Sequence, residues 1–158
     1  MQSVSRLSRW LLFVLGLMTS LMADVRAAEL KLKAELVWGT DDASPPNKNY
    51  QPLAPALREK VRQLRWKNYF VVNAATSSPA KDSKKVDLSD RCSLTIKDIG
   101  NGQVQVSIFN PKAEKPTEPV ATKVLAVDKL KQGHAYIIGG DSKDRWDDAW
   151  LVFITIGE

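Results

Sequence analysis

The sequence predicts a mainly β protein with one helix: an antiparallel β-sandwich or a partly open barrel, with a short amphipathic helix packed on it. Short segments in which apolar and polar residues alternate recur along the chain, as they do in half-buried strands. An Asn-Gly pair, residues 101–102, separates two of these segments and is typical of a β-hairpin turn. One other stretch spaces its apolar residues as a helix does. The 158 residues are enough for one domain.

Residues 1–27 are predicted to be a signal peptide, and residues 28–158 a single β-rich domain. Two arginines precede an apolar run over residues 10–18, and Val25 and Ala27 fit the −3 and −1 positions of a cleavage site. A retained N-terminal anchor is the alternative, although the run is shorter than the roughly 20 residues that span a bilayer. We expect no transmembrane segment after cleavage and a periplasmic or extracellular location.

Charge and residue counts exclude several functions. Loss of the signal segment removes three arginines and one aspartate, so the net charge falls from +5 to +3. This mild balance lacks the concentrated basic face that nucleic-acid binding needs, and we predict no nucleic-acid partner. One Cys and one His allow no internal disulfide and no zinc site that needs several cysteines or two imidazoles. We also predict no cofactor.

The first half of the domain is predicted to contain one strand, a loop and the helix. Alternating apolar residues favour a strand over residues 29–38, and the Pro- and Asp-rich residues 39–47 favour a loop. Pro55 suits the first turn of a helix. A stripe at helical spacing follows, and the helix is expected to end near residues 66–68. The stripe consists of Leu57, Val61 and Leu64.

The second half is predicted to consist of strands and turns. The final segment, residues 150–156, is apolar on both faces, which is typical of a central strand. The stretch 110–119 contains three prolines and is predicted to be an exposed loop. The other predicted strands are 69–72, 86–88, the hairpin 92–97 with 103–108, 123–127, and 135–138, which Gly139 and Gly140 are expected to stop.

Four carboxylates between residues 141 and 148 are candidate metal ligands, because clustered carboxylate oxygens suit calcium. The EF-hand pattern fails, since Lys143 occupies its third position and Trp146 its sixth. A solvated turn between strands is the simpler interpretation, so we predict no metal site. The four candidates are Asp141, Asp144, Asp147 and Asp148.

Candidate binding residues are one tryptophan and a basic run. Trp146 lies in a polar loop and is the one tryptophan of the domain expected to be an exposed aromatic, whereas the others belong to patterned elements and are expected to pack in the core or cover an edge. The basic run on or after the helix could face an anionic surface, although a solvated helix face is the simpler interpretation. Its members are Arg58, Arg62 and Arg65.

Cys92 and His134 are the remaining reactive side chains. Cys92 alternates with Leu94 and Ile96, so it is expected to be a small buried residue rather than a reactive thiol. His134 could join a Ser and an Asp in a hydrolytic triad, but the nucleophile elbow Gly-x-Ser-x-Gly is absent. No catalytic residue is therefore predicted.

Four segments, in this order, are similar to an uncharacterised family of small secreted bacterial proteins: Leu36–Asp42, Leu57–Phe70, Gly100–Gly102 and Ile137–Asp141. The resemblance covers nearly all of the predicted domain. It implies a secreted domain with a leading strand, a helix, a β-meander and a Gly-Gly corner before the last strand. It implies no known activity, and no functional residue transfers.

We therefore expect a secreted, non-enzymatic envelope protein that acts by binding or scaffolding, with an unknown envelope protein or polymer as its partner. The alternatives are a small envelope hydrolase, which would bring His134 or paired acids into a cleft, and a carbohydrate-binding module, which would expose Trp146 beside a coplanar aromatic. A scaffold would instead expose an apolar patch or an unpaired strand edge.

Overall fold

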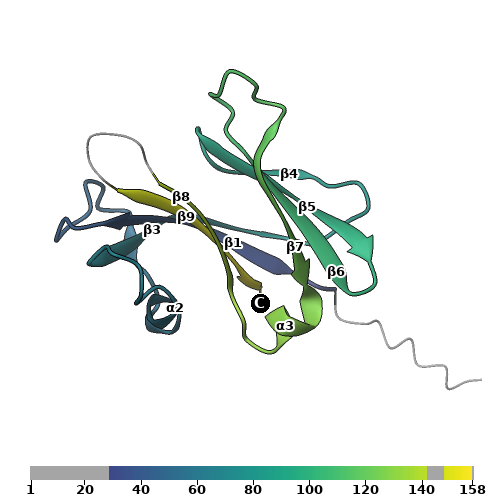
Figure 1. Ribbon diagram of the computed structural model, residues 1–158, viewed down its shortest axis with the longest axis horizontal. Coiled ribbons are helices and arrows are strands. Elements are labelled where there is room, and N and C mark those ends of the chain that lie inside the picture. The colour runs from purple at the N-terminus through teal and green to yellow at the C-terminus, as the bar shows by residue number, and fades with distance from the viewer. Residues whose placement is uncertain (1–28, 142–147, 158) are drawn as a thin grey trace, which may run out of the picture.

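Two antiparallel sheets form the protein in a computed structural model that describes residues 29–141 and 148–157 (Figure 1). Sheet A has the strand order β2-β3-β1-β9-β8, and sheet B the order β4-β5-β6-β7. The predicted β-sandwich is confirmed. The strands are β1 (Leu32–Thr40), β2 (Gln51–Pro52), β3 (Asn68–Ser77), β4 (Lys85–Ser89), β5 (Cys92–Gly100), β6 (Gln103–Phe109), β7 (Pro119–Ala126), β8 (Tyr136–Asp141) and β9 (Ala149–Ile156), and the helices are α2 (Pro55–Lys60) and α3 (Val127–Lys131).

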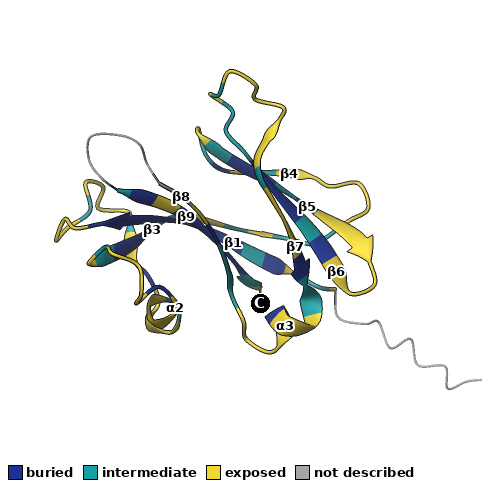
Figure 2. Ribbon diagram, in the orientation of Figure 1, coloured by how far each residue is buried: buried dark blue, intermediate teal, exposed yellow. Residues whose placement is uncertain are grey.

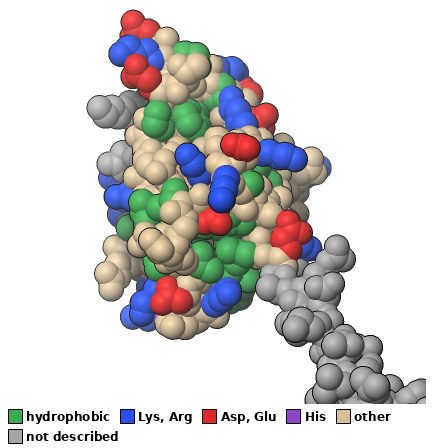
Figure 3. Space-filling view, turned by 90° about the vertical axis from the view of Figure 1, so that its right-hand side faces the viewer, with side chains coloured by type: hydrophobic (Ala, Val, Ile, Leu, Met, Phe, Trp, Pro, Cys, Tyr) green, Lys and Arg blue, Asp and Glu red, His purple; other side chains and the backbone are tan. Residues whose placement is uncertain are grey.

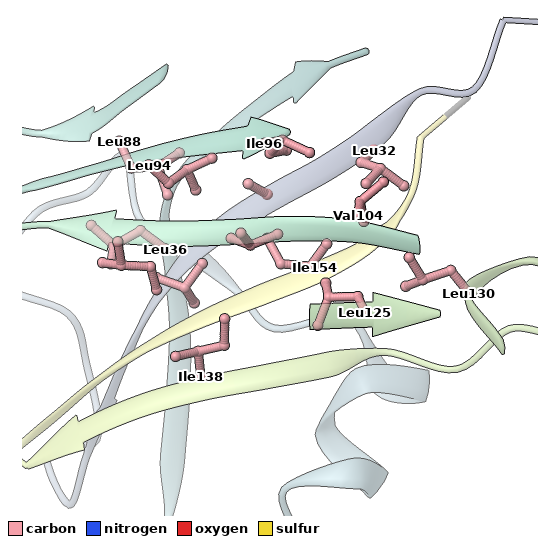
Figure 4. Close-up of a cluster of buried hydrophobic side chains, with 14 residues drawn as sticks. Leu32, Leu36, Leu88, Leu94, Ile96, Val104, Leu125, Leu130, Ile138 and Ile154 are labelled. Carbon is pink, nitrogen blue, oxygen red and sulfur yellow. The ribbon is translucent and has the colours of Figure 1, made fainter. Parts of the chain in front are cut away.

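The main core lies between the two sheets (Figure 4). Alternate residues of a strand point to the same face of a sheet, so the long strands of both sheets contribute one face each to this core, whereas both residues of the short strand β2 are exposed. Leu94 and Ile154 are both fully buried there, from sheet B and sheet A respectively. The rest of the cluster consists of Leu32, Ala34, Leu36, Leu88, Ile96, Val104, Val106, Ile108, Leu125, Leu130, Ile138 and Val152.

A second, smaller cluster lies on the other face of sheet A, beneath the segment that contains α2. Its centre is Phe153, which follows Val152 on β9 and is fully buried. Strand β9 is therefore covered on both faces, as its continuous apolar sequence predicts. The remaining buried members are Val37, Leu53, Val61, Tyr69, Ala149 and Leu151. Figure 2 shows buried residues along the central strands and exposed residues along α2.

The predicted hairpin is present as β5 and β6. Leu94 pairs with Ile108 and Ile96 with Val106, so the alternating apolar residues of both strands share the inner face. Three consecutive residues at the turn have positive φ: 82° at Gly100, 54° at Asn101 and 68° at Gly102. Glycine and asparagine adopt this conformation at low cost, which explains why they mark the turn.

The predicted helix is shorter than expected, because α2 ends at Lys60 rather than near residues 66–68. The chain then turns so that Val61 packs on sheet A, while Leu64 remains 40% exposed. Two hydrogen bonds from the following residues hold this path: the Lys67 N–H donates to Asp41 Oδ1 at 3.1 Å, and the Asn68 side chain donates to the Asp42 carbonyl at 2.8 Å.

Other elements also differ from the predictions: β2 was not predicted, and β3 continues to Ser77 where a strand over residues 69–72 was expected. Strand β7 begins at Pro119, earlier than expected, and the five-residue helix α3 follows it directly, where a strand and a turn were predicted. Gly139 and Gly140 do not stop β8, which continues to Asp141 beside β9. A Cβ at Gly139 would lie 2.7 Å from Leu151 Cδ2, so the glycine lets the two strands pack closely.

No helix among the described residues is long and apolar enough to cross a membrane. The predicted signal segment lies outside the described residues, as do Asp144, Trp146 and Asp147.

Candidate functional site: a cleft between the sheets

An open cleft of about 680 Å³ lies between the two sheets at the end remote from α3. Strands β5, β7 and β9 begin there, and β6 ends there. In Figure 1 the ribbons of the two sheets lie closest near α3 and diverge toward this end. The volume falls within the range of small-molecule sites, about 300–1,000 Å³.

The floor of the cleft is aliphatic. Leu36, Ile138 and Val152 line it from sheet A, and Ile108 from sheet B. These four residues also belong to the main core, so the cleft is the place where that core opens to solvent. Val72 of β3 extends the same surface. Apolar surface of this kind favours contact with an apolar ligand over contact with water.

Three aromatic side chains occupy one row across sheet A, because Phe70 pairs with Trp38 and Trp38 pairs with Trp150. Trp38 and Phe70 are each 7% exposed, and their ring centroids lie 6.1 Å apart. Trp150 is 40% exposed and lines the cleft. The expectation that Trp150 is covered is therefore wrong. Trp150 lies on the same face of β9 as Val152. Trp150 is nearer the open end of the sandwich, however, where sheet B covers sheet A less.

Tyr50 and Phe109 add aromatic surface from the two sides of the cleft. Tyr50 directly precedes β2 on the sheet A side, and Phe109 ends β6 in sheet B. Both side chains are half-buried. Together with Trp150 they give the cleft an aromatic lining above its aliphatic floor.

The polar side chains of the cleft gather at its sheet B rim, where residues 90 and 91 form the turn between β4 and β5. The Lys112 ammonium donates a hydrogen bond to the Asp90 carboxylate and lowers the pKa of that carboxyl. The Arg91 N–H donates to Ser89 Oγ at 3.2 Å, which fixes the turn. Asp90 and Arg91 are the charged side chains that line the described cleft.

Cys92 also lines the cleft, and it is half-buried rather than fully buried as its alternation with Leu94 predicts. Burial raises the pKa of the Cys92 thiol from 9.0 to about 11, because the thiolate loses water around its charge. The thiol is therefore the stable form at neutral pH, which agrees with the prediction of an unreactive residue.

We expect Cys92 to react with iodoacetamide at pH 8 about a hundredfold more slowly than an unburied cysteine does, since the thiolate is the nucleophile and a pKa two units higher reduces its population a hundredfold. Mass spectrometry at timed intervals measures the rate. Denaturation in urea should restore the fast rate. Equal rates in the folded and unfolded protein would show that the thiol is not shielded.

The predicted basic residues lie outside the cleft, on and after α2. Arg58 Nη2 donates to the Lys67 carbonyl at 3.2 Å, Arg62 Nη1 lies 3.7 Å from Glu59 Oε2, and the Arg65 guanidinium lies 5.0 Å from the centroid of the Trp66 ring. These contacts agree with a solvated surface on which the basic side chains interact with residues close to them in sequence. On the face shown in Figure 3, basic and acidic side chains are also interspersed around separate hydrophobic patches.

His134 is exposed in the turn after α3, at the end of the sandwich opposite the cleft, and it does not line the cleft. Of the acidic candidates, Asp141 ends β8, and Asp148 directly precedes β9 and is half-buried. Within residues 29–141 and 148–157, no group of three or more His, Cys, Asp or Glu side chains could hold a metal ion. The described structure thus brings neither His134 nor a pair of acids into the cleft.

The sequence interpretation missed Trp150, Tyr50, Phe109 and Arg91. The position of Arg91 in a turn could have been predicted, because two charged residues between two short apolar strands are typical of a tight turn. The exposure of Trp150 has no comparable signal, since alternation assigns a residue to a face of a sheet but does not say where the facing sheet ends.

No protein-family model, no curated protein and no solved structure matches this chain.

Proposed function

We propose that this chain is a secreted, non-enzymatic envelope protein that binds an apolar small molecule in the cleft between its two sheets. The observation that carries the proposal is the exposed Trp150 at the mouth of a cleft whose floor is aliphatic. A large aromatic side chain left 40% exposed beside other apolar groups is costly in water, and a ligand that covers it recovers this free energy.

Binding, rather than catalysis, is supported by the chemistry of the lining. Catalysis by general acid and base needs titratable groups within hydrogen-bond reach of the reacting atoms. The carboxylate that lines the described cleft, Asp90, is already hydrogen-bonded to Lys112, and its lowered pKa makes it a poor base at neutral pH. Secretion and an envelope location are proposed from the predicted signal peptide alone.

A neutral fluorescent probe tests the proposal. N-phenyl-1-naphthylamine emits strongly only in apolar surroundings, and we expect its emission to rise and saturate with the protein. Trp150→Ala should weaken binding about tenfold, because about 1.4 kcal/mol of contact free energy is lost with a large aromatic ring. Fluorescence titration gives both dissociation constants.

Ile99→Ala is the matched control, because Ile99 is 39% exposed but lies beside the β5–β6 turn, remote from the cleft. It should leave the dissociation constant unchanged. If the native protein does not bind the probe, or if both variants bind as the native protein does, the cleft is not an apolar binding site.

A further inference from the structure

We infer that the ligand of the cleft is an amphipathic carboxylate: a single aliphatic chain that lies along the floor, with its anionic head at the guanidinium of Arg91. This inference rests on the proposed function and adds the polarity of the ligand to it.

The rim of the cleft at the turn between β4 and β5 carries a net positive charge. Arg91 is exposed, and within the described part of the chain its guanidinium makes no hydrogen bond and no ion pair. Its neighbour Asp90 is an anion, but the Lys112 ammonium binds that carboxylate directly. Asp90, Arg91 and Lys112 together therefore carry a net charge of +1. An anionic head complements this charge, and guanidinium binds a carboxylate through two parallel hydrogen bonds.

Polar and apolar groups are segregated within the cleft. The side chains that can donate or accept hydrogen bonds along the deeper surface are few, because Leu36, Ile138 and Val152 form the floor. Asn110 and Ser89 lie with Arg91 on the sheet B side. A sugar ring carries hydroxyl groups on all its edges, and those facing the floor would lose hydrogen bonds to water without replacement. A molecule that is polar at one end only avoids this cost.

The size of the cleft limits what it can bind. A volume of about 680 Å³ is suited to a small molecule rather than to a folded partner, which would need a contact of the order of 800 Å² on each side. The cleft is also open to solvent, so a chain can enter without a large movement of either sheet.

Octanoate and 1-octanol, which share one aliphatic chain and differ in the head group, test the inference by displacement of N-phenyl-1-naphthylamine. At pH 7.5 and low salt, octanoate should displace the probe at about three- to fivefold lower concentration than octanol does, as expected for a partly exposed ion pair. Arg91→Gln should abolish this preference and leave the affinity for octanol unchanged. Lys97→Gln, on the outer face of sheet B, is the control and should keep the preference.

The outcomes separate the two proposals. If neither the probe nor octanol binds, the proposed function fails. If octanol binds as tightly as octanoate, or if the preference for octanoate persists in Arg91→Gln, the cleft takes apolar ligands but the assignment of the anionic head to Arg91 is wrong. High salt should reduce the preference in the native protein, since it screens an exposed charge pair.

Discussion

Replacement of Phe153 by alanine should lower the free energy of unfolding by about 3–5 kcal/mol. The Phe153 side chain is completely buried, with a relative accessibility of 0%. It belongs to the cluster beneath the α2 segment. Alanine there leaves a cavity between that segment and sheet A, because the sheet backbone cannot move in to fill it. Urea denaturation followed by tryptophan fluorescence measures the loss.

Val124→Ala is the control for this prediction. Val124 is 52% exposed on the edge strand β7, so its truncation should cost less than about 1 kcal/mol. Equal losses for the two variants would mean that the cluster on the outer face of sheet A contributes nothing to stability.

Leu94→Ala should be the other strongly destabilising change, by about 2–5 kcal/mol. Leu94 is 0% exposed in the main core, where β5 pairs it with Val86 of β4 and Ile108 of β6. Truncation to alanine leaves a cavity there, because the residues around a packed core position relax only in part. The same urea titration measures the loss, and a loss near zero would contradict the close contact between the sheets.

The double variant Phe153→Ala with Leu94→Ala tests whether the two clusters are independent. The two residues belong to clusters on opposite faces of sheet A. Their effects on the free energy of unfolding should therefore add within about 0.5 kcal/mol. A larger discrepancy would show that the clusters share their stability through the strands between them.

The local patterns predicted most of sheet B and the central strand. Alternation around Asn101 and Gly102 was enough to place the hairpin, because a two-stranded unit is defined by neighbouring residues. The length of α2 was not predictable in the same way. Val61 continues the helical stripe, but a contact with sheet A places it outside the helix, and such contacts override helical spacing over a single turn.

The helix α3 shows a similar limit. Five residues are too few to display a helical period, and only two local signals mark its ends: Asp128 near its start, and Gly133, with φ of 83°, after its last turn. The glycines of β8 were misleading for a different reason. Gly139 is required by the proximity of Leu151 on the neighbouring strand, and no local pattern reveals that neighbour.

The cleft itself depends on pairings that are distant in sequence. Trp38 and Trp150 are brought side by side by the pairing of β1 with β9, and Arg91 reaches the same region from the other sheet. Composition and motifs could identify each residue type but not their common location. The candidate site therefore depends on the packing of the two sheets, which local sequence patterns do not specify.

The position of β9 has a consequence for the order in which the protein can fold. Strand β9 lies between β1 and β8, so sheet A has its final strand order only after residues 149–156 are available. The contacts that complete it join Gly39 to Ala149 and Leu32 to Ile156, across more than a hundred intervening residues. Closing so long a loop is entropically slow, whereas β5 and β6 can pair as soon as their hairpin has been synthesised. One edge of β1 consequently stays unpaired until the end of folding, and this is the stage at which a chain of this topology is most exposed to pairing with another copy.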